Sequence, residues 1–128
     1  MITLDLNRLP AEQLGARTIT TETVVVENIR RFNSFAEFYP YYLSEHSDST
    51  CRRLHFIGTT LVIFILAMAI GKGAWLLLLC LPLAGYSFAW AGHFFFEKNR
   101  PATFQHPFYS LLGDFVMYRD MILGRVPF

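Results

Sequence analysis

Two long apolar segments dominate the pattern of hydrophobic and polar positions in this chain. The first runs from Leu54 to Ile70, interrupted only by one histidine, one glycine and two threonines, and the second runs from Ala74 to Phe96. As α-helices these segments would be about 25 Å and about 34 Å long, close to the roughly 30 Å hydrocarbon layer of a bilayer. The pattern therefore predicts two membrane-spanning helices, over about 54–70 and 74–96. The alternative is a buried hairpin in a soluble protein.

The connection between the two segments is the tripeptide Gly71-Lys72-Gly73. Glycine allows the backbone of a tight turn, and so short a connection makes the two predicted helices antiparallel neighbours. The basic residues at the other ends of the helices are Arg52, Arg53, Lys98 and Arg100. Because positive residues accumulate on the cytoplasmic side of membrane proteins, we expect both outer ends of the hairpin to face the cytoplasm.

Two shorter segments flank the predicted spans. Aromatic residues recur at helical spacing from Phe32 to Tyr42, and Pro40 is expected to kink or end that helix. From Phe108 to Gly124 apolar residues again predominate, but the charged residues Asp114, Arg119 and Asp120 interrupt them. We expect this last segment to pack on the hairpin or to lie along the membrane surface rather than to form a third span.

The predicted fold class is an all-α membrane protein, in which an antiparallel transmembrane helical hairpin is accompanied by interfacial or packed helices. Residues 31–128 would form this single membrane-embedded domain, preceded by a polar tail over residues 1–30. The tail contains TITTETVVVENI (18–29), which alternates enough to allow a strand but has no partner strand in view. The tail also lacks the unbroken apolar core of a signal peptide.

Composition supports a membrane protein. Hydrophobic residues make up 53% of the chain and aromatic residues 16%, against 16% charged residues. The net charge of +1 creates no field able to attract a nucleic acid, so no nucleic-acid partner is expected. Cys51 and Cys80 would lie roughly 20 Å apart along the hairpin, whereas a disulfide needs Cα atoms within about 7 Å. We therefore expect two free thiols.

Four histidines are the strongest candidates for chemistry: His46, His55, His93 and His106. On one continuous helix His46 and His55 would lie on opposite faces, but the SDST cluster between them favours a cap and a new helix, which lets the two converge. His93 ends the second span at the level of His55, and His106 follows a proline-broken turn. The four are thus predicted to share one membrane depth as a metal site, since neutral imidazoles suit zinc, copper, nickel and iron. The alternative is that they are only polar groups at the interface.

Glu97 and Arg100 are the candidate catalytic residues beside this site. Glu97 follows His93 by one turn of an α-helix, so both would lie on one face. Glu97 is expected to orient the His93 imidazole; the alternatives are that it binds the metal or pairs with Arg100.

Three arginines are candidates for substrate binding. Arg52, Arg53 and Arg100 could hold a substrate carboxylate by charge-assisted hydrogen bonds. The alternative is that they only anchor the protein at the cytoplasmic face. Of the nearby acids, Asp48 is expected to cap a helix and Asp114 to be a packed polar contact.

At this point two blocks of sequence resemble a known family. FYPYYLSEHSDSTCRRLHFIGT (38–59) and WAGHFFFEKNRPATFQHP (90–107) are similar to the two blocks of the Mpo-type 2-hydroxy fatty acid dioxygenases, small integral membrane proteins known in fungi and widespread in bacteria. The resemblance extends from about Phe32 to Met121. It rests on the His-x8-His spacing, the Gly-His pair and the Glu-Lys-x-Arg-Pro-Ala run. The chain departs from the family in having SDST after the first histidine and fewer spans than the fungal members.

The resemblance implies an iron(II)-dependent dioxygenase of fatty-acid α-oxidation, which shortens a 2-hydroxy fatty acid by one carbon. It places metal ligands at His46, His55 and His93, while His106 matches only the short bacterial-type members. The implied partners are a long-chain 2-hydroxy fatty acid, O2 and membrane lipid. The implied location is a multi-pass protein of the inner membrane if the source is bacterial, or of the endoplasmic reticulum if it is fungal.

Two functions of other classes stay open at this point. His55 and His93 on adjacent helices could be the axial ligands of a haem. The protein could also be a small membrane protein without enzymatic activity. A histidine-box desaturase or hydroxylase is disfavoured, because neither an HxxxH nor an HxxHH motif occurs in the chain.

Overall fold

The computed structural model describes residues 31–128, and every regular element in that range is a helix. The elements in chain order are α3 (Phe35–Ser44), α4 (Ser49–Lys72), the 3-10 helix η2 (Trp75–Cys80), α5 (Leu81–Ala91), the π-helix η3 (Gly92–Glu97), the 3-10 helix η4 (Ala102–Phe104) and α6 (Pro107–Ile122). The all-helical class is thereby confirmed for the described part of the chain. The predicted polar tail (1–30) and the possible strand within it (18–29) lie outside the described residues.

The first long helix, α4, extends beyond its predicted limits at both ends. It begins at Ser49 because Asp48 caps it, as expected: the Asp48 carboxylate accepts hydrogen bonds from the backbone N–H groups of Thr50 (2.7 Å) and Cys51 (3.0 Å). At the other end α4 continues to Lys72, and Gly73 reverses the chain with a φ of 64°. Glycine adopts this left-handed conformation without a steric cost, so the turn is shorter than the predicted tripeptide.

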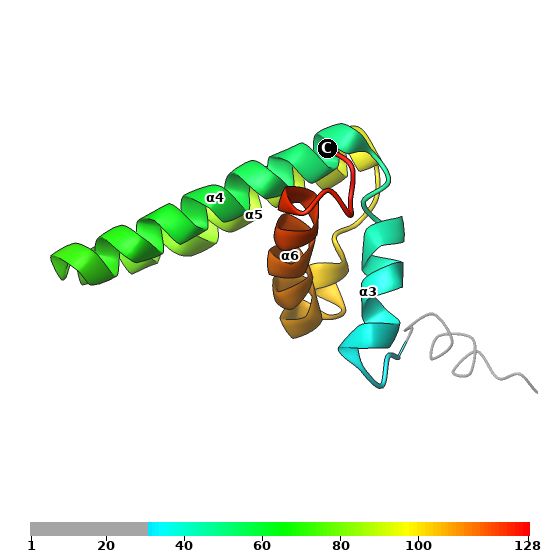
Figure 1. Cartoon of the computed structure of the whole chain (residues 1–128), viewed down its shortest axis with the longest axis horizontal. Coiled ribbons are helices and arrows are strands. Elements are labelled where there is room, and N and C mark those ends of the chain that lie inside the picture. Colours follow the sequence, from blue (N-terminus) through cyan, green and yellow to red (C-terminus); the bar gives the residue numbers. More distant parts are fainter. Residues whose placement is uncertain (1–30) are drawn as a thin grey trace, which may run out of the picture. The chain divides into compact units, whose positions relative to one another are not determined.

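The second long helix combines η2, α5 and η3 into one continuous rod over Trp75–Glu97. It lies alongside α4, and we call the two rods the helix pair (Figure 1). Gly58 of α4 permits their close approach, because a Cβ atom there would lie 3.1 Å from Phe88 Cβ and 3.3 Å from the Ala84 carbonyl oxygen. A small residue at the contact therefore brings the two backbones together.

A compact aromatic core lies where α3 and α6 meet one end of the helix pair. Its buried residues are Phe38, Tyr42, Ala102, Met117, Met121 and Val126. A Cβ atom at Gly113 of α6 would lie 2.9 Å from ring carbons of Tyr42, so glycine is needed for α6 to approach α3. As expected, α6 is a packed helix rather than a third candidate span. Of the two outcomes expected at Pro40, the end is wrong: α3 continues through the proline and ends after Ser44.

The C-terminal segment is fastened to α4 and to α3. The Arg52 side chain donates a hydrogen bond to the Pro127 carbonyl oxygen (2.8 Å). Asp120, buried on α6, accepts hydrogen bonds from the Tyr39 hydroxyl (2.9 Å) and from Arg119 (2.8 Å). Burial opposes ionisation of Asp120, but the bonds from Arg119 and Tyr39 outweigh it and lower the pKa of this carboxyl. Asp120 therefore stays ionised and ties α6 to α3.

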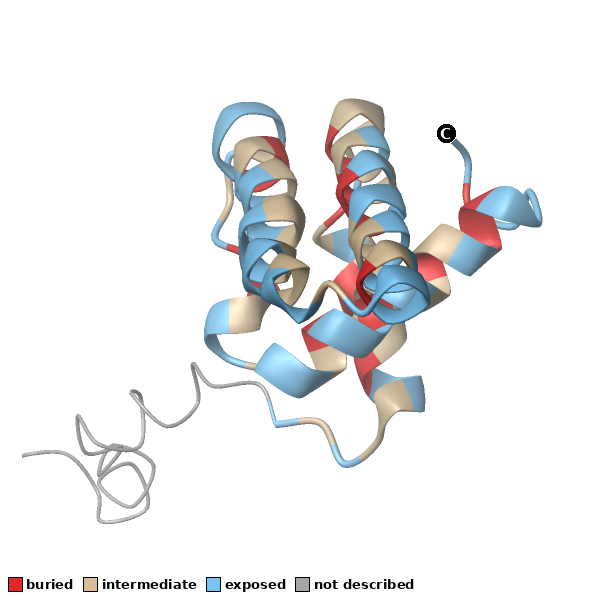
Figure 2. Ribbon diagram, turned by 90° about the vertical axis from the view of Figure 1, so that its left-hand side faces the viewer, coloured by how far each residue is buried: buried red, intermediate tan, exposed pale blue. Residues whose placement is uncertain are grey.

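Apolar side chains remain exposed along most of the helix pair. Buried residues gather at the end that α3 and α6 cover, and exposed or intermediate positions dominate the two rods (Figure 2). By length and composition, both rods can cross a membrane, and they are the two such helices in the described residues. Only 22% and 11% of their most apolar stretches are buried, which argues against the predicted alternative of a buried soluble hairpin.

Candidate metal centre

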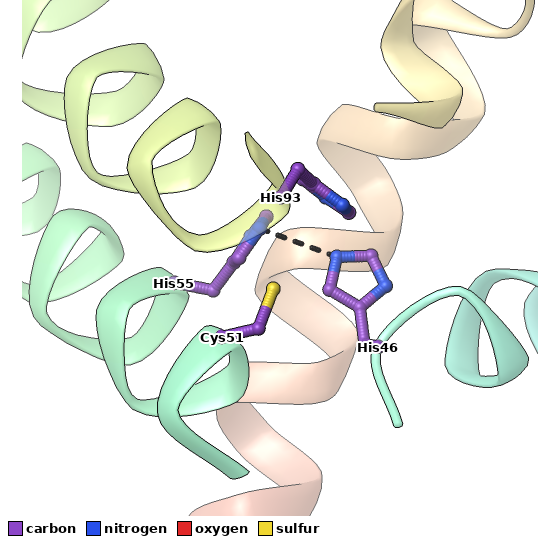
Figure 3. A group of neighbouring side chains, drawn as sticks. All are labelled: His46, Cys51, His55 and His93. Carbon is purple, nitrogen blue, oxygen red and sulfur yellow. Dashed lines mark hydrogen bonds between the residues drawn. The ribbon is translucent and has the colours of Figure 1, made fainter. Parts of the chain in front are cut away.

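Three histidines from three separate segments converge at the covered end of the helix pair. His46 lies in the loop between α3 and α4, His55 lies on α4, and His93 lies in η3. Their ring centroids are 4.5, 4.6 and 5.0 Å apart, and each residue is at most 6% exposed (Figure 3). The new helix that begins at Asp48 is what brings His46 and His55 together, as the sequence predicted.

Each of the three imidazoles is held by a hydrogen bond at its Nδ1 atom. The bonds run from His46 to the Tyr42 carbonyl oxygen (2.6 Å), from His55 to Asp114 Oδ1 (2.8 Å) and from His93 to Asn99 Oδ1 (2.7 Å). Carbonyl and carboxylate oxygens only accept hydrogen bonds, so the Nδ1 atoms of His46 and His55 carry the protons. Metal-binding histidines are usually fixed in this way, with the other ring nitrogen left free.

Asn99 is itself oriented by a neighbour. Its amide Nδ2 donates hydrogen bonds to the Glu45 carbonyl oxygen (3.1 Å) and carboxylate (3.0 Å). The amide oxygen therefore faces His93, and His93 also donates from Nδ1. All three histidines consequently present an unprotonated Nε2 atom.

The Nε2 atoms of His46 and His55 lie 3.2 Å apart, the contact drawn as a dashed line in Figure 3. Two lone pairs at this distance repel each other unless a proton or a cation lies between them. Burial, together with the charge that His55 and His93 would carry if protonated, lowers the pKa of His46 well below its usual range. A metal ion fits better than a proton, since two nitrogens bound to one ion at about 2.1 Å lie about 3.0–3.4 Å apart at common bond angles.

Cys51, which was predicted only to be a free thiol, is a fourth member of the cluster. Its Sγ atom and one ring nitrogen from each of the three histidines all lie within 4.8 Å of one another. Both cysteines are free, as expected, with Cys51 buried and Cys80 exposed. A Cβ atom at Gly92 would lie 2.9 Å from the Cys51 sulfur, so glycine is required where η3 crosses α4. Cys51 lies four residues before His55, and this helical spacing could have predicted that Cys51 belongs to the cluster.

The expected role of Glu97 in orienting His93 is wrong. Residues 92–97 form a π-helix, and the hydrogen bond at His93 Nδ1 is made to Asn99 and not to Glu97. Lys98 then adopts a left-handed φ of 58°, which returns the chain so that Asn99 reaches His93. Glu97 instead accepts hydrogen bonds from the backbone N–H groups of Ser47 (2.8 Å) and Asp48 (2.7 Å) and from the Ser47 hydroxyl. It holds the loop that carries His46.

The predicted substrate-binding arginines are not gathered at the histidines. Arg52 donates hydrogen bonds to the backbone carbonyl oxygens of His46 (2.9 Å) and Ser47 (2.6 Å), so it braces the same loop as Glu97. Arg53 is exposed. Arg100 is exposed and lines a separate hollow of about 680 Å³ beside Tyr41 and Glu45, whose lining includes none of the histidines. Within residues 31–128, Arg52 is thus engaged by backbone carbonyl oxygens, and Arg53 and Arg100 lie at the surface.

His106 also lies apart from the cluster, contrary to the prediction that four histidines share one site. Its ring packs against the rings of Phe32 (5.2 Å) and Phe38 (5.5 Å), and its Nε2 atom is buried without a hydrogen-bond partner in the described part of the chain. The turn after Pro101 leads into η4 and α6, and this places His106 on the far side of the aromatic core. Its role in the structure is packing.

Asp114 and Tyr42 support the cluster from α6 and α3. The Tyr42 hydroxyl donates to the same Asp114 oxygen that accepts from His55, and the centroid of the Tyr42 ring lies 4.1 Å from that of the His46 ring, with the two planes tilted by 31°. Burial, followed by the charge of Asp114, raises the pKa of the Tyr42 phenol well above its usual range, so Tyr42 keeps its proton and acts as a donor. Asp114 was predicted from the sequence, but only as a packed polar contact.

The fold and the site define a small helical protein whose buried cluster of three histidines and one cysteine could bind a metal ion. A family model described as "2-hydroxy-palmitic acid dioxygenase Mpo1-like" matches residues 32–126, so the chain belongs to this family. The family suggests a 2-hydroxy fatty acid dioxygenase. No curated protein and no solved structure matches the chain.

Asp114→Asn should weaken metal binding because a neutral amide accepts a weaker hydrogen bond from His55 Nδ1–H than the carboxylate does, which makes His55 a poorer ligand. Partners of this kind typically contribute about 10- to 100-fold in metal affinity or activity. Asp48→Asn is the matched control, since asparagine caps a helix about as well as aspartate and residue 48 contacts none of the three imidazoles. Titration of each purified protein with ferrous ion measures the difference. Equal affinities in the two variants would contradict the role of Asp114.

Proposed function

We propose that this protein is an iron(II)-dependent dioxygenase that shortens 2-hydroxy fatty acids by one carbon. The observation that carries the proposal is the cluster of three imidazoles, each held at Nδ1 and each presenting Nε2 to the same small space. Membership of the Mpo1-like family supports the reaction class.

His46, His55 and His93 would hold the ferrous ion. Their neutral nitrogens do not compensate its charge, so an anionic substrate that offers two adjacent oxygens is a favourable further ligand. A 2-hydroxy acid has these two oxygens, in its hydroxyl and carboxylate groups, whereas an unsubstituted fatty acid has only the carboxylate. The metal would supply the activation of O2. We assign no metal-binding role to His106.

The overall reaction balances without an added reductant. A 2-hydroxy acid and O2 give a carboxylic acid one carbon shorter, CO2 and water. The bond between the carboxyl carbon and the hydroxyl-bearing carbon breaks, and these two carbons together lose four electrons, which reduce O2 fully. A site with no redox partner in the protein is therefore sufficient for this chemistry.

The residues around the histidines keep the site rigid and dry. Phe38 and Tyr42 are at most 1% exposed and cover it from the side of α3. Asp114 and Asn99 fix two of the rings, and Glu97 and Arg52 hold the loop that carries the third. Glu97 and Arg52 are thus proposed to position His46 rather than to contact the substrate.

A haem protein is the weaker candidate. Axial ligation by His55 and His93 would require the porphyrin plane to pass between their rings. The His46 ring lies 4.5 Å from the His55 ring and 4.6 Å from the His93 ring, so it occupies the space on one side that the macrocycle would need. The cluster suits a bare ion better.

We further propose that residues 31–128 form one membrane-embedded domain, with the helix pair as an antiparallel transmembrane hairpin. Its exposed apolar side chains and the basic residues at its outer ends support this arrangement. The histidine cluster would then lie near the cytoplasmic boundary of the bilayer.

This topology predicts which side of the membrane Lys72 faces. A cysteine at position 72, in a protein whose exposed Cys80 is replaced by serine, should react in sealed vesicles with an impermeant reagent added on the side opposite the cytoplasm. Positive residues at the outer ends of the hairpin are the physical reason. Labelling from the cytoplasmic side alone would show that the orientation is reversed.

The enzymatic proposal predicts that iron and activity depend on His93 but not on His106. Protein purified without chelators should contain iron and should consume O2 with a long-chain 2-hydroxy fatty acid, but not with the unsubstituted acid. His93→Phe should lose iron and activity together, whereas His106→Phe, which keeps a ring in the aromatic core, should retain both. Iron per protein and oxygen uptake are the measurements.

Two outcomes would count against the proposal. Full iron occupancy in a folded His93→Phe protein would remove His93 from the ligand set. Unchanged physiological function after replacement of all three clustered histidines would instead favour a membrane protein without enzymatic activity.

A further inference from the structure

An elongated apolar groove of about 360 Å³ begins at the histidine cluster. His55 and Asp114 belong to its lining, and it continues along the helix pair beside α6. On α4 it is lined by His55, Thr59, Val62 and Leu66, whose spacing of four, three and four residues places them on one helical face. On the antiparallel rod, Leu81, Gly85 and Ala89 recur every four residues. The groove is therefore a narrow channel parallel to the helix axes.

The depth of the groove matches one leaflet of a bilayer. From His55 to Leu66 the axis of α4 advances about 16 Å, close to half of the roughly 30 Å hydrocarbon layer. His55 lies near the start of α4, so in the proposed membrane arrangement its end of the groove would be at the membrane boundary and Leu66 near the midplane. An alkyl chain in this groove would lie at the depth that it already occupies in the lipid.

Small residues on the second rod keep the groove open. A Cβ atom at Gly85 would lie 3.5 Å from Val62 Cγ2, which shows that glycine leaves room for about one methyl group opposite Val62. The outer wall is partly exposed, with Leu66 at 40% and Phe115 at 39%. A chain could therefore enter sideways from the membrane.

We propose that this groove binds the alkyl chain of the substrate and that Val62 and Leu66 determine its accepted length. The carboxylate and hydroxyl would lie at the histidines, and the chain would extend past Thr59 and Val62 towards Leu66. The inference rests on the proposed function for the identity of the head group. Because lipid tails are as apolar as the groove, the fit of the chain rather than its removal from water would set the preference, so blocking the groove at a chosen depth should exclude chains that extend beyond that depth.

Tryptophan substitutions at two depths test the proposal. Val62→Trp should lower kcat/KM for long 2-hydroxy acids by at least about tenfold and leave kcat/KM for short ones unchanged. Leu66→Trp should lower kcat/KM only for the acids with the longest chains. Ile57→Trp is the matched control, because Ile57 is an isomer of leucine, is 45% exposed against 40% for Leu66, and lies on the opposite face of α4, outside the groove. The iron content should be the same in the three variants and in the wild-type protein. A chain-length profile of Val62→Trp that matches that of Ile57→Trp would overturn the proposal.

Photocrosslinking separates failure of the groove from failure of the proposed reaction. A long-chain 2-hydroxy acid with a diazirine at the end of its chain is bound to the iron-loaded protein without O2, irradiated, and its attachment sites are mapped by mass spectrometry. Attachment at Leu66, Leu81 and their groove neighbours supports the groove, even if the wild-type protein oxidises no 2-hydroxy acid. Attachment spread over the lipid-facing sides of both rods refutes the groove, even if the protein is an active dioxygenase.

Discussion

Three buried imidazoles direct their Nε2 lone pairs into one small space, where those of His46 and His55 repel each other. Burying a polar atom without a hydrogen-bond partner costs free energy. At each Nδ1 atom this cost is avoided, because a carbonyl, carboxylate or amide oxygen accepts a hydrogen bond. The same bonds direct the three Nε2 atoms inward, where those of His46 and His55 are 3.2 Å apart. A cation bound between the ring nitrogens could satisfy both atoms.

Much of the polar structure around the cluster serves to keep the His46 loop in place. Glu97, at the end of η3, accepts hydrogen bonds from the backbone N–H groups of this loop, and Arg52, on α4, donates hydrogen bonds to its carbonyl oxygens. Glu97 was predicted to be catalytic because it follows His93 by four residues, and Arg52 was predicted to bind substrate because an arginine can hold a carboxylate. In the structure their hydrogen bonds are made to the protein, which leaves the proposed substrate to be held by the metal at one end and by the apolar groove along its chain.

The sequence predicted the parts of the fold that depend on local patterns. Apolar length identified the two rods, Asp48 in the SDST cluster identified the new helix, and this new helix explained how His46 meets His55. The errors arose where contacts between distant segments decide the outcome. Glu97 was assigned to His93 from their spacing, but its carboxylate accepts hydrogen bonds from Ser47 and Asp48 in a distant segment. Asn99 was overlooked because only the reversal at Lys98 brings it back to His93. His106 was grouped with the others by sequence position alone, although the aromatic core separates it from them.

The proposed chemistry depends on the binding of one ferrous ion by the Nε2 atoms of His46, His55 and His93. Iron X-ray absorption on the reconstituted protein tests it most directly, because the scattering pattern of imidazole rings and the distance to nitrogen are both measured at the metal. The account predicts three imidazole ligands, with nitrogen at about 2.0–2.2 Å. A spectrum with fewer than three imidazoles, or one dominated by sulfur at about 2.3 Å, would contradict it.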